Sequence, residues 1–354
     1  MPPGPKPSLS AGLATEKALV EGPAVELLVQ MGWQHADLLA EQPGPANPTG
    51  RLSFKEALLP ARLRAALRRL NPGLPDEALT QAEVALGQSR AAMLPVAANR
   101  EVVRLLREGV AVELRQPDGS LKPDRVRLID WTTPTANDFF LATQPWFSSE
   151  LYKRRPDTVG FVNGIPLLLC EWKAPTQPIQ DAYDGNLSNY RDTIPQLFDA
   201  NGFTILSTGL AALMGASHAP FDAYAPWKRL EEDGADSVAL ETMLRATCEP
   251  ARFLDLIENF LLFEDARGGL RKVVGKYHQV LGVNRAIEAV QKLEENRGKL
   301  GVFWHTRAAA RACPWSCSPR RRCGVWAATG PSSLSPTGRS WTTRSPAPSP
   351  IPAR

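Results

Sequence analysis

The composition of this 354-residue chain changes abruptly after Thr306, and the change limits which part can fold. Residues 307–354 contain eight Arg, eight Pro and eight Ser, but no Asp, Glu or Lys. Such a segment has too little apolar surface to offset the conformational entropy that ordering would cost. We therefore expect a disordered tail at 307–354, a disordered Pro-rich lead at 1–12, and a folded body between them.

The tail also determines the net charge. Its eight arginines change a body of net −4, with 33 Lys and Arg against 37 Asp and Glu, into a chain of net +4. The overall basic charge is therefore no indication that the body binds nucleic acid. The body has two cysteines, Cys170 and Cys248, which argues against a disulfide framework and fits a reducing, cytoplasmic location. No apolar run reaches about 18 residues, so no membrane span is expected.

The spacing of apolar residues predicts a mixed architecture. Helices are expected at 15–31, 54–70, 75–92, 99–108, 179–190, within 220–263, and at 277–295. Strands are expected at 110–114, 126–131, 138–142 and 203–207, with a hairpin at 157–173. This order predicts an α/β (α+β mixed) fold in which a helical N-terminal cap surrounds a mixed sheet.

Asp157 and the tripeptide Glu171-Trp172-Lys173 carry the strongest chemical signal. Glu171 and Lys173 are two residues apart on a strand, so both side chains point to one face. A two-residue hairpin loop would pair Asp157 with Cys170 and turn Glu171 away from it. A three-residue loop through Ile165 with a bulge, or an equivalent shift, would pair Asp157 with Glu171.

Paired carboxylates repel each other, and a divalent cation removes that cost. Mg²⁺ prefers one or two carboxylates together with waters and phosphate oxygens, and a neighbouring lysine can orient water or stabilise charge on phosphorus. Asp157, Glu171 and Lys173 are thus a minimal set for phosphodiester hydrolysis, with Asp157 and Glu171 as metal ligands. The alternative is that Glu-Trp-Lys is a solvated strand end and Asp157 a turn residue.

The stretch from Arg155-Pro156-Asp157 through Asn163-Gly164 to Glu171-Trp172-Lys173 resembles the nuclease core of the restriction (R) subunit of type I restriction–modification enzymes. Flanking matches follow in the same order. They are Leu70-Asn71-Pro72, Asn99-Arg100, Leu128-Ile129-Asp130, Asn137-Asp138-Phe139, Asn189-Tyr190-Arg191 and Val302-Phe303-Trp304-His305-Thr306.

This resemblance implies a PD-(D/E)xK endonuclease-like domain at 13–215, a helical connector at 216–270 and the start of a superfamily 2 motor domain at 271–306. It also implies Mg²⁺ and ATP as cofactors. The implied partners are double-stranded DNA and the methylation and specificity subunits of the complex.

The resemblance also suggests roles for single residues. Asp157, Glu171 and Lys173 match the family's catalytic triad. Asn186 stands where the family often has Gln, one helical turn before Tyr190. A Glu of the first helix commonly faces the site, and both Glu16 and Glu21 qualify, with Glu21 preferred. In the motor, Tyr277 and Gln279 match an element that binds adenine, although an ordinary helix start explains them equally.

After Thr306 the chain lacks the glycines and lysine of a P-loop, so ATP binding is expected to be lost. Read one frame over, a back-translation of Arg307–Ala312 gives Gly-Ser-Gly-Lys-Ser, which favours a one-base loss over a natural basic tail. Three functions are therefore weighed. They are a truncated Mg²⁺-dependent DNA endonuclease module, a non-catalytic remnant that docks on partner subunits, and a free-standing nuclease with a DNA-binding tail.

Overall fold

The computed structural model describes residues 16–116, 118–231, 234–235, 240–292, 294–295 and 297. The predicted lead at 1–12, the P-loop entry at 302–306 and the tail at 307–354 lie outside the described residues. In the part of the chain that the structure describes, no helix is both long enough and apolar enough to cross a bilayer.

A six-stranded mixed sheet forms the centre of the fold, in the order β1-β4-β7-β8-β9-β10. The strands are β1 (Gln34–Asp37), β4 (Phe139–Thr143), β7 (Thr158–Val162), β8 (Ile165–Trp172), β9 (Phe203–Ser207) and β10 (Ala212–Gly215). β1 runs parallel to β4, and β8 runs parallel to β9, whereas the other neighbours are antiparallel. The ends of β1, β4, β8 and β9 and the start of β7 therefore share one edge. The mixed α/β prediction is confirmed.

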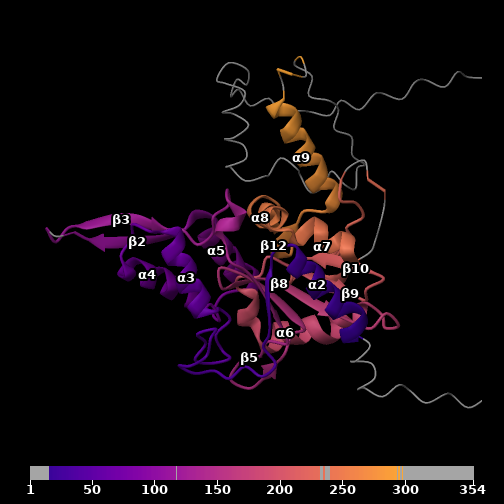
Figure 1. Ribbon diagram of the computed structural model, residues 1–354, viewed down its shortest axis with the longest axis horizontal. Helices are drawn as coiled ribbons and strands as arrows, with labels where there is room; N and C mark the ends of the chain where they lie inside the picture. The colour runs from indigo at the N-terminus through magenta and orange to yellow at the C-terminus, as the bar shows by residue number, and fades with distance from the viewer. Residues whose placement is uncertain are drawn as a thin grey trace, which may run out of the picture.

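Helices cover both faces of this sheet (Figure 1). One face packs against α2 (Gly22–Gln30), which continues a π-helical turn η1 (Lys17–Glu21), and against α7 (Leu240–Cys248) and α8 (Pro250–Asn259). The other face packs against η3 (Ala182–Leu187), α6 (Ser188–Thr193) and η4 (Pro195–Phe198). Each face buries a separate apolar cluster, so the sheet edge remains the place where polar side chains can gather.

The N-terminal helices match the predicted cap, with different boundaries. They are α3 (Pro60–Leu70), α4 (Asp76–Gly87) and α5 (Pro95–Glu108). The helix expected at 54–70 begins at Pro60, because a proline favours the first helical position and holds the residue before it extended. The helix expected at 99–108 also begins at a proline, Pro95, which is earlier than predicted. It ends as predicted before Gly109, whose φ of 80° is easily adopted by glycine.

Among the residues that the structure describes, three two-stranded hairpins accompany the sheet. They are β2 (Val110–Arg115) with β3 (Leu121–Val126), β5 (Phe147–Ser148) with β6 (Lys153–Arg154), and β11 (Leu261–Ala266) with β12 (Gly269–Val274). Helix was expected within 220–263, and α7 and α8 lie there, but the end of that range is wrong, because α8 ends at Asn259 and β11 begins at Leu261. The helix expected at 277–295 is α9 (Tyr277–Gln291). It stands away from the sheet in Figure 1.

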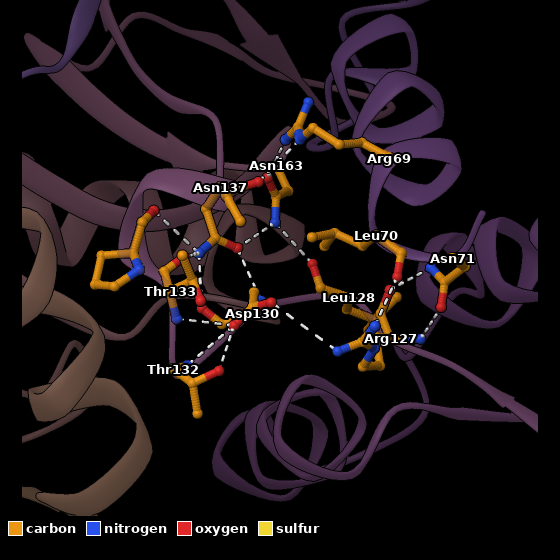
Figure 2. Close-up of polar contacts among 12 residues, drawn as sticks. Arg69, Leu70, Asn71, Arg127, Leu128, Asp130, Thr132, Thr133, Asn137 and Asn163 are labelled. Carbon is orange, nitrogen blue, oxygen red and sulfur yellow. Dashed lines mark hydrogen bonds and ion pairs between the residues drawn. The ribbon is translucent and has the colours of Figure 1, made fainter.

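The prediction of a strand at 126–131 is also wrong, because β3 ends at Val126. Side-chain amides bind the backbone that follows, as Figure 2 shows. Asn71 Oδ1 accepts from the Arg127 amide at 2.8 Å, and Asn71 Nδ2 donates to the Arg127 carbonyl at 2.9 Å. Asn137 accepts from the Asp130 amide at 2.9 Å and donates to its carbonyl at 2.7 Å. These residues therefore satisfy their backbone groups without a partner strand.

The same network holds the turn of the β7–β8 hairpin. Asn163 Nδ2 donates to Asn137 Oδ1 at 2.9 Å, and Asn163 Oδ1 accepts from the Asp138 amide at 2.8 Å. Asn163 and Gly164 have φ angles of 53° and 76°, as a two-residue primed turn requires. The network thus fixes the hairpin at the end opposite the polar sheet edge.

Candidate functional site

A β-bulge determines which side chains meet at the sheet edge. Phe161 pairs with Pro166, but Gly160 pairs with Leu168, so Leu167 is an extra residue in β8. The prediction of a three-residue loop is therefore wrong. The turn has two residues, and the bulge within β8 shifts the pairing register by the one residue that the other predicted arrangement required. Gly160 fits this bend because a Cβ there would lie 2.9 Å from the ring of Trp33.

The shifted register places Asp157 opposite Glu171. The Asp157 amide donates to Glu171 Oε1 at 3.3 Å, and the Trp172 amide donates to Asp157 Oδ2 at 2.9 Å. Glu171 is fully buried, whereas Asp157 and Lys173 are half-buried. The structure thus brings the three predicted residues together where the sheet edge opens to solvent.

Burial raises the pKa of both acids, and the charge of Asp157 adds to the shift of Glu171. Burial, followed by the nearby Asp157 charge, raises the pKa of Glu171 well above its ordinary value. The pKa of Asp157 is also raised, chiefly by burial, while the Trp172 amide and the Lys173 charge oppose the shift. The pair therefore retains a proton more readily than two exposed carboxylates would.

Asn186 and Tyr190 approach the pair from the helical face below the sheet. Asn186 Nδ2 donates to Glu171 Oε2 at 2.5 Å. The buried Tyr190 hydroxyl donates to the Arg155 carbonyl at 3.4 Å, which steadies the chain just before Asp157. The structure therefore brings both predicted residues to the site, Asn186 against a carboxylate and Tyr190 against the backbone.

Two glutamates of the first helical segment add further negative charge. Glu16 and Glu21 are both buried. Burial, followed by the Asp157 charge, raises the pKa of Glu16 to about 7 and that of Glu21 to about 6. The structure does not choose between them, because the charge of Asp157 acts on both.

Gln144 is a site residue that the sequence analysis did not identify. It follows β4 on the same sheet edge, with a φ of 53°. Its amide donates to the Asp157 carbonyl at 2.8 Å, and its Nε2 lies 3.5 Å from Glu21 Oε2. A polar residue directly after a buried strand was the available signal, but no spacing rule connects it to Asp157.

Tyr277 and Gln279 do not reach this site. They lie at the start of α9, where Gln279 Oε1 accepts from the Lys276 amide at 2.9 Å, which is the N3 half of a capping box. The geometry gives these residues a role in starting the helix. It does not test the predicted contact with adenine.

Few possible metal ligands surround the carboxylate pair. Among the residues that the structure describes, no group of three or more His, Cys, Asp or Glu side chains is arranged to hold a metal ion. Asp157 and Glu171 remain as a carboxylate pair with a lysine beside it. Such a pair suits a hard cation that keeps several waters, but does not suit a closed structural metal centre.

Comparison with known proteins identifies the family to which this chain belongs. Residues 14–223 match the family model for the type I restriction enzyme R protein N terminus. The chain therefore belongs to this family, and the match includes the sheet, Asp157, Glu171 and Lys173.

Two relatives extend the match along the chain. The type I restriction enzyme HindI endonuclease subunit of Haemophilus influenzae is 32% identical over 83% of this chain and 28% of its own length. A putative type I restriction enzyme MjaIXP endonuclease subunit of Methanocaldococcus jannaschii is 24% identical over 87% of this chain and 31% of its own length. The chain thus spans less than a third of each of these relatives.

Proposed function

We propose that this chain is the Mg²⁺-dependent DNA endonuclease module of a type I restriction enzyme R subunit, with a PD-(D/E)xK-type site. The meeting of Asp157 with Glu171 beside Lys173 carries the proposal. This arrangement depends on a bulge that interrupts strand pairing, so simple sheet geometry would not produce it.

The residues fit a bound Mg²⁺. Asp157 and Glu171 would hold it, since burial raises the pKa of both and the charge of Asp157 raises that of Glu171 further, and a bound divalent cation stabilises both charged forms. Bound there, Mg²⁺ would supply Lewis-acid polarisation of a phosphate and a more acidic water. Asn186 fixes the Glu171 carboxylate, and the Trp172 amide fixes that of Asp157. Both acids are therefore oriented before substrate arrives.

Lys173 supplies the positive charge of the site. Its backbone amide donates to the Ser207 carbonyl at 2.9 Å, which anchors its main chain beside β9. From there its ammonium group can hydrogen-bond the attacking water and stabilise the charge that develops on the phosphate oxygens. Its half-buried position leaves the group accessible to DNA.

The wider assembly follows from the family. The relatives' names describe endonuclease subunits of type I restriction enzymes. We infer that the module acts on double-stranded DNA in the cytoplasm, in a complex with methylation and specificity subunits. We further infer that ATP-driven translocation would need the motor that this chain begins but whose P-loop residues it lacks.

The test is Lys173→Ala, placed in a full-length R subunit assembled with its partner subunits. Loss of a preorganised charge is expected to slow cleavage by roughly 10²–10³-fold. Thermal stabilisation by Mg²⁺ should persist, because both carboxylates remain. Lys122→Ala, which changes an exposed lysine of β3, is the matched control and should cut normally.

Equal cleavage by Lys173→Ala and the control would remove the catalytic assignment. Absence of cleavage by every assembled complex, the unsubstituted one included, would favour a non-catalytic remnant that docks on the partner subunits.

A further inference from the structure

A short basic hairpin precedes the carboxylate pair along the chain. We use this name for residues 146–155, which comprise β5, a four-residue loop and β6. Phe147 pairs with Arg154, and Ser148 pairs with Lys153. Lys153 and Arg155 are exposed, and Arg154 is half-buried. Three consecutive cations thus lead directly towards Asp157.

Aromatic rings contact all three of these cations, and the guanidinium of Arg154 lies 5.1 Å from the ring centroid of Tyr152. Lys153 Nζ lies 4.3 Å from the ring centroid of Phe54 and 4.4 Å from that of Trp146. The guanidinium of Arg155 lies 5.3 Å from the Trp146 ring. Trp146 is itself fixed, because its Nε1 donates to the Leu39 carbonyl at 3.0 Å. Contacts of this kind contribute about 0.5–1 kcal/mol each at exposed positions. They restrict long side chains that would otherwise sample many rotamers.

No carboxylate neutralises these cations within the described residues. Lys153, Arg154 and Arg155 form no ion pair there, whereas Lys55 and Arg62 each pair with an acid. Glu150, the acid of the hairpin, pairs with Lys55 at 2.6 Å. The three positive charges are therefore available to an external anionic partner.

The hairpin is attached to the same elements as the carboxylate site. Arg154 Nε donates to Asn189 Oδ1 on α6 at 2.5 Å. Arg155 precedes Asp157 by two residues, and Arg154 precedes it by three. Three extended residues span at most about 10 Å, which equals the rise of roughly three base pairs along the DNA helix axis. The cations therefore lie within reach of the phosphates that flank a phosphate bound at Asp157.

We propose that the basic hairpin binds the phosphate backbone of duplex DNA beside the carboxylate pair and thereby positions the scissile phosphate. The inference rests on the proposed function for the identity of the partner. The loop supports it with apolar side chains, since Leu151 is 85% exposed and Tyr152 is 47% exposed. Exposed apolar residues next to cations are suited to a DNA groove, where such side chains insert between base steps.

The test measures binding of the full chain to duplex DNA in metal-free buffer, by fluorescence anisotropy at several salt concentrations. Lys153→Gln with Arg155→Gln removes two phosphate contacts. The slope of log K against log salt is expected to fall by about 1.8 relative to the unsubstituted chain, or roughly 0.9 per contact. The arginines of residues 307–354 are present in every variant, so their contribution cancels.

The matched control is Arg245→Gln with Arg271→Gln, which removes the same charge from α7 and β12. Each of these arginines pairs with a glutamate of its neighbourhood, Glu241 or Glu264. The control should keep the original slope. Equal slopes for the control and the hairpin variant would overturn the inference.

Two further measurements keep the result decisive. If the double variant melts at a lower temperature, Lys153→Gln alone should still lower the slope by about 0.9. An unchanged slope for that folded single variant would also overturn the inference. Because binding is measured without metal, a complex that binds DNA through the hairpin but never cuts it would refute the proposed function and leave this inference standing.

Discussion

Asp157→Asn should stabilise the metal-free protein while removing its response to Mg²⁺. The substitution preserves shape, and the new amide oxygen can still accept from the Trp172 amide, which now donates to Asp157 Oδ2 at 2.9 Å. The new amide nitrogen is expected to donate to Glu171, with which the Asp157 side chain shares a hydrogen bond, so the variant needs no retained proton to avoid two adjacent charges. Stability and function should therefore change in opposite directions at this residue.

The magnitude follows from Coulomb's law. Two like unit charges at a separation of about 5 Å would repel by roughly 3 kcal/mol at an effective dielectric constant of about 20. The retained proton relieves part of this repulsion in the unsubstituted protein. We therefore expect a gain of about 1–2 kcal/mol at pH 8, or a rise in Tm of roughly 3–6 °C.

The gain should depend on pH in a defined direction. The folded-state pKa values of Asp157 and Glu171 are raised, so their protonated forms stabilise the fold at acidic pH. This contribution is lost as the pH rises through the folded pKa values. The difference between variant and unsubstituted chain should thus be small near about pH 4, where unfolded carboxyls also hold protons, and largest at pH 8.

Thermal melts in a chelating buffer and in Mg²⁺ provide the assay. At a Mg²⁺ concentration of about 100 times Kd, the unsubstituted chain should gain about 2.7 kcal/mol. Asp157→Asn should gain much less, whereas Asp265→Asn, at an exposed position of β11, should behave like the unsubstituted chain. A destabilised Asp157→Asn at pH 8, or a difference that does not change with pH, would refute repulsion between the two carboxyls.

Other expected outcomes follow from the turn and from the gene. Gly164→Ala should lower stability by about 1–3 kcal/mol in thermal melts, because φ is 76° and a Cβ would lie 2.6 Å from the Leu59 carbonyl oxygen. Gly185→Ala, where a Cβ meets nothing within 4 Å, is the control and should not lower the stability. Equal melting temperatures for the two variants would contradict the argument. Inserting one base near codon 307 should open a reading frame that encodes Gly-Ser-Gly-Lys-Ser. An immediate stop codon in that frame would refute the interpretation that one base was lost. The purified chain should show no DNA-stimulated ATPase activity, because P-loop glycines and lysine do not follow Thr306.

The local chemistry of the hairpin could be predicted from the sequence. Asn163-Gly164 marked the turn, and apolar arms led from it to Asp157 and Glu171. The chemistry of a paired site required both carboxylates on one face, so a register shift was expected. The position of the shift could not be predicted, because a bulge at Leu167 depends on how Gly160 packs against Trp33.

The remaining differences have a common physical cause, which is contact between residues far apart in the chain. The segment after Val126 is apolar enough for a strand, but Asn71 occupies the backbone groups of Arg127 from 56 residues away. Gln144 reaches Glu21 across 123 residues. Periodicity within a short window carries no information about either pairing.

The extra residue in β8 has a consequence for the spacing of the two acids along the chain. In a hairpin with a two-residue turn and uninterrupted pairing, residues that face each other are separated by an odd number, as Asp157 and Cys170 would be. Asp157 and Glu171 are separated by an even number, so they can face each other across such a turn only if one strand contains an inserted residue. The parity of the spacing is therefore a criterion for a hidden bulge. Deleting Leu167 would make the separation odd, so regular pairing alone would then hold the glutamate opposite Asp157 and the bulge would no longer be needed.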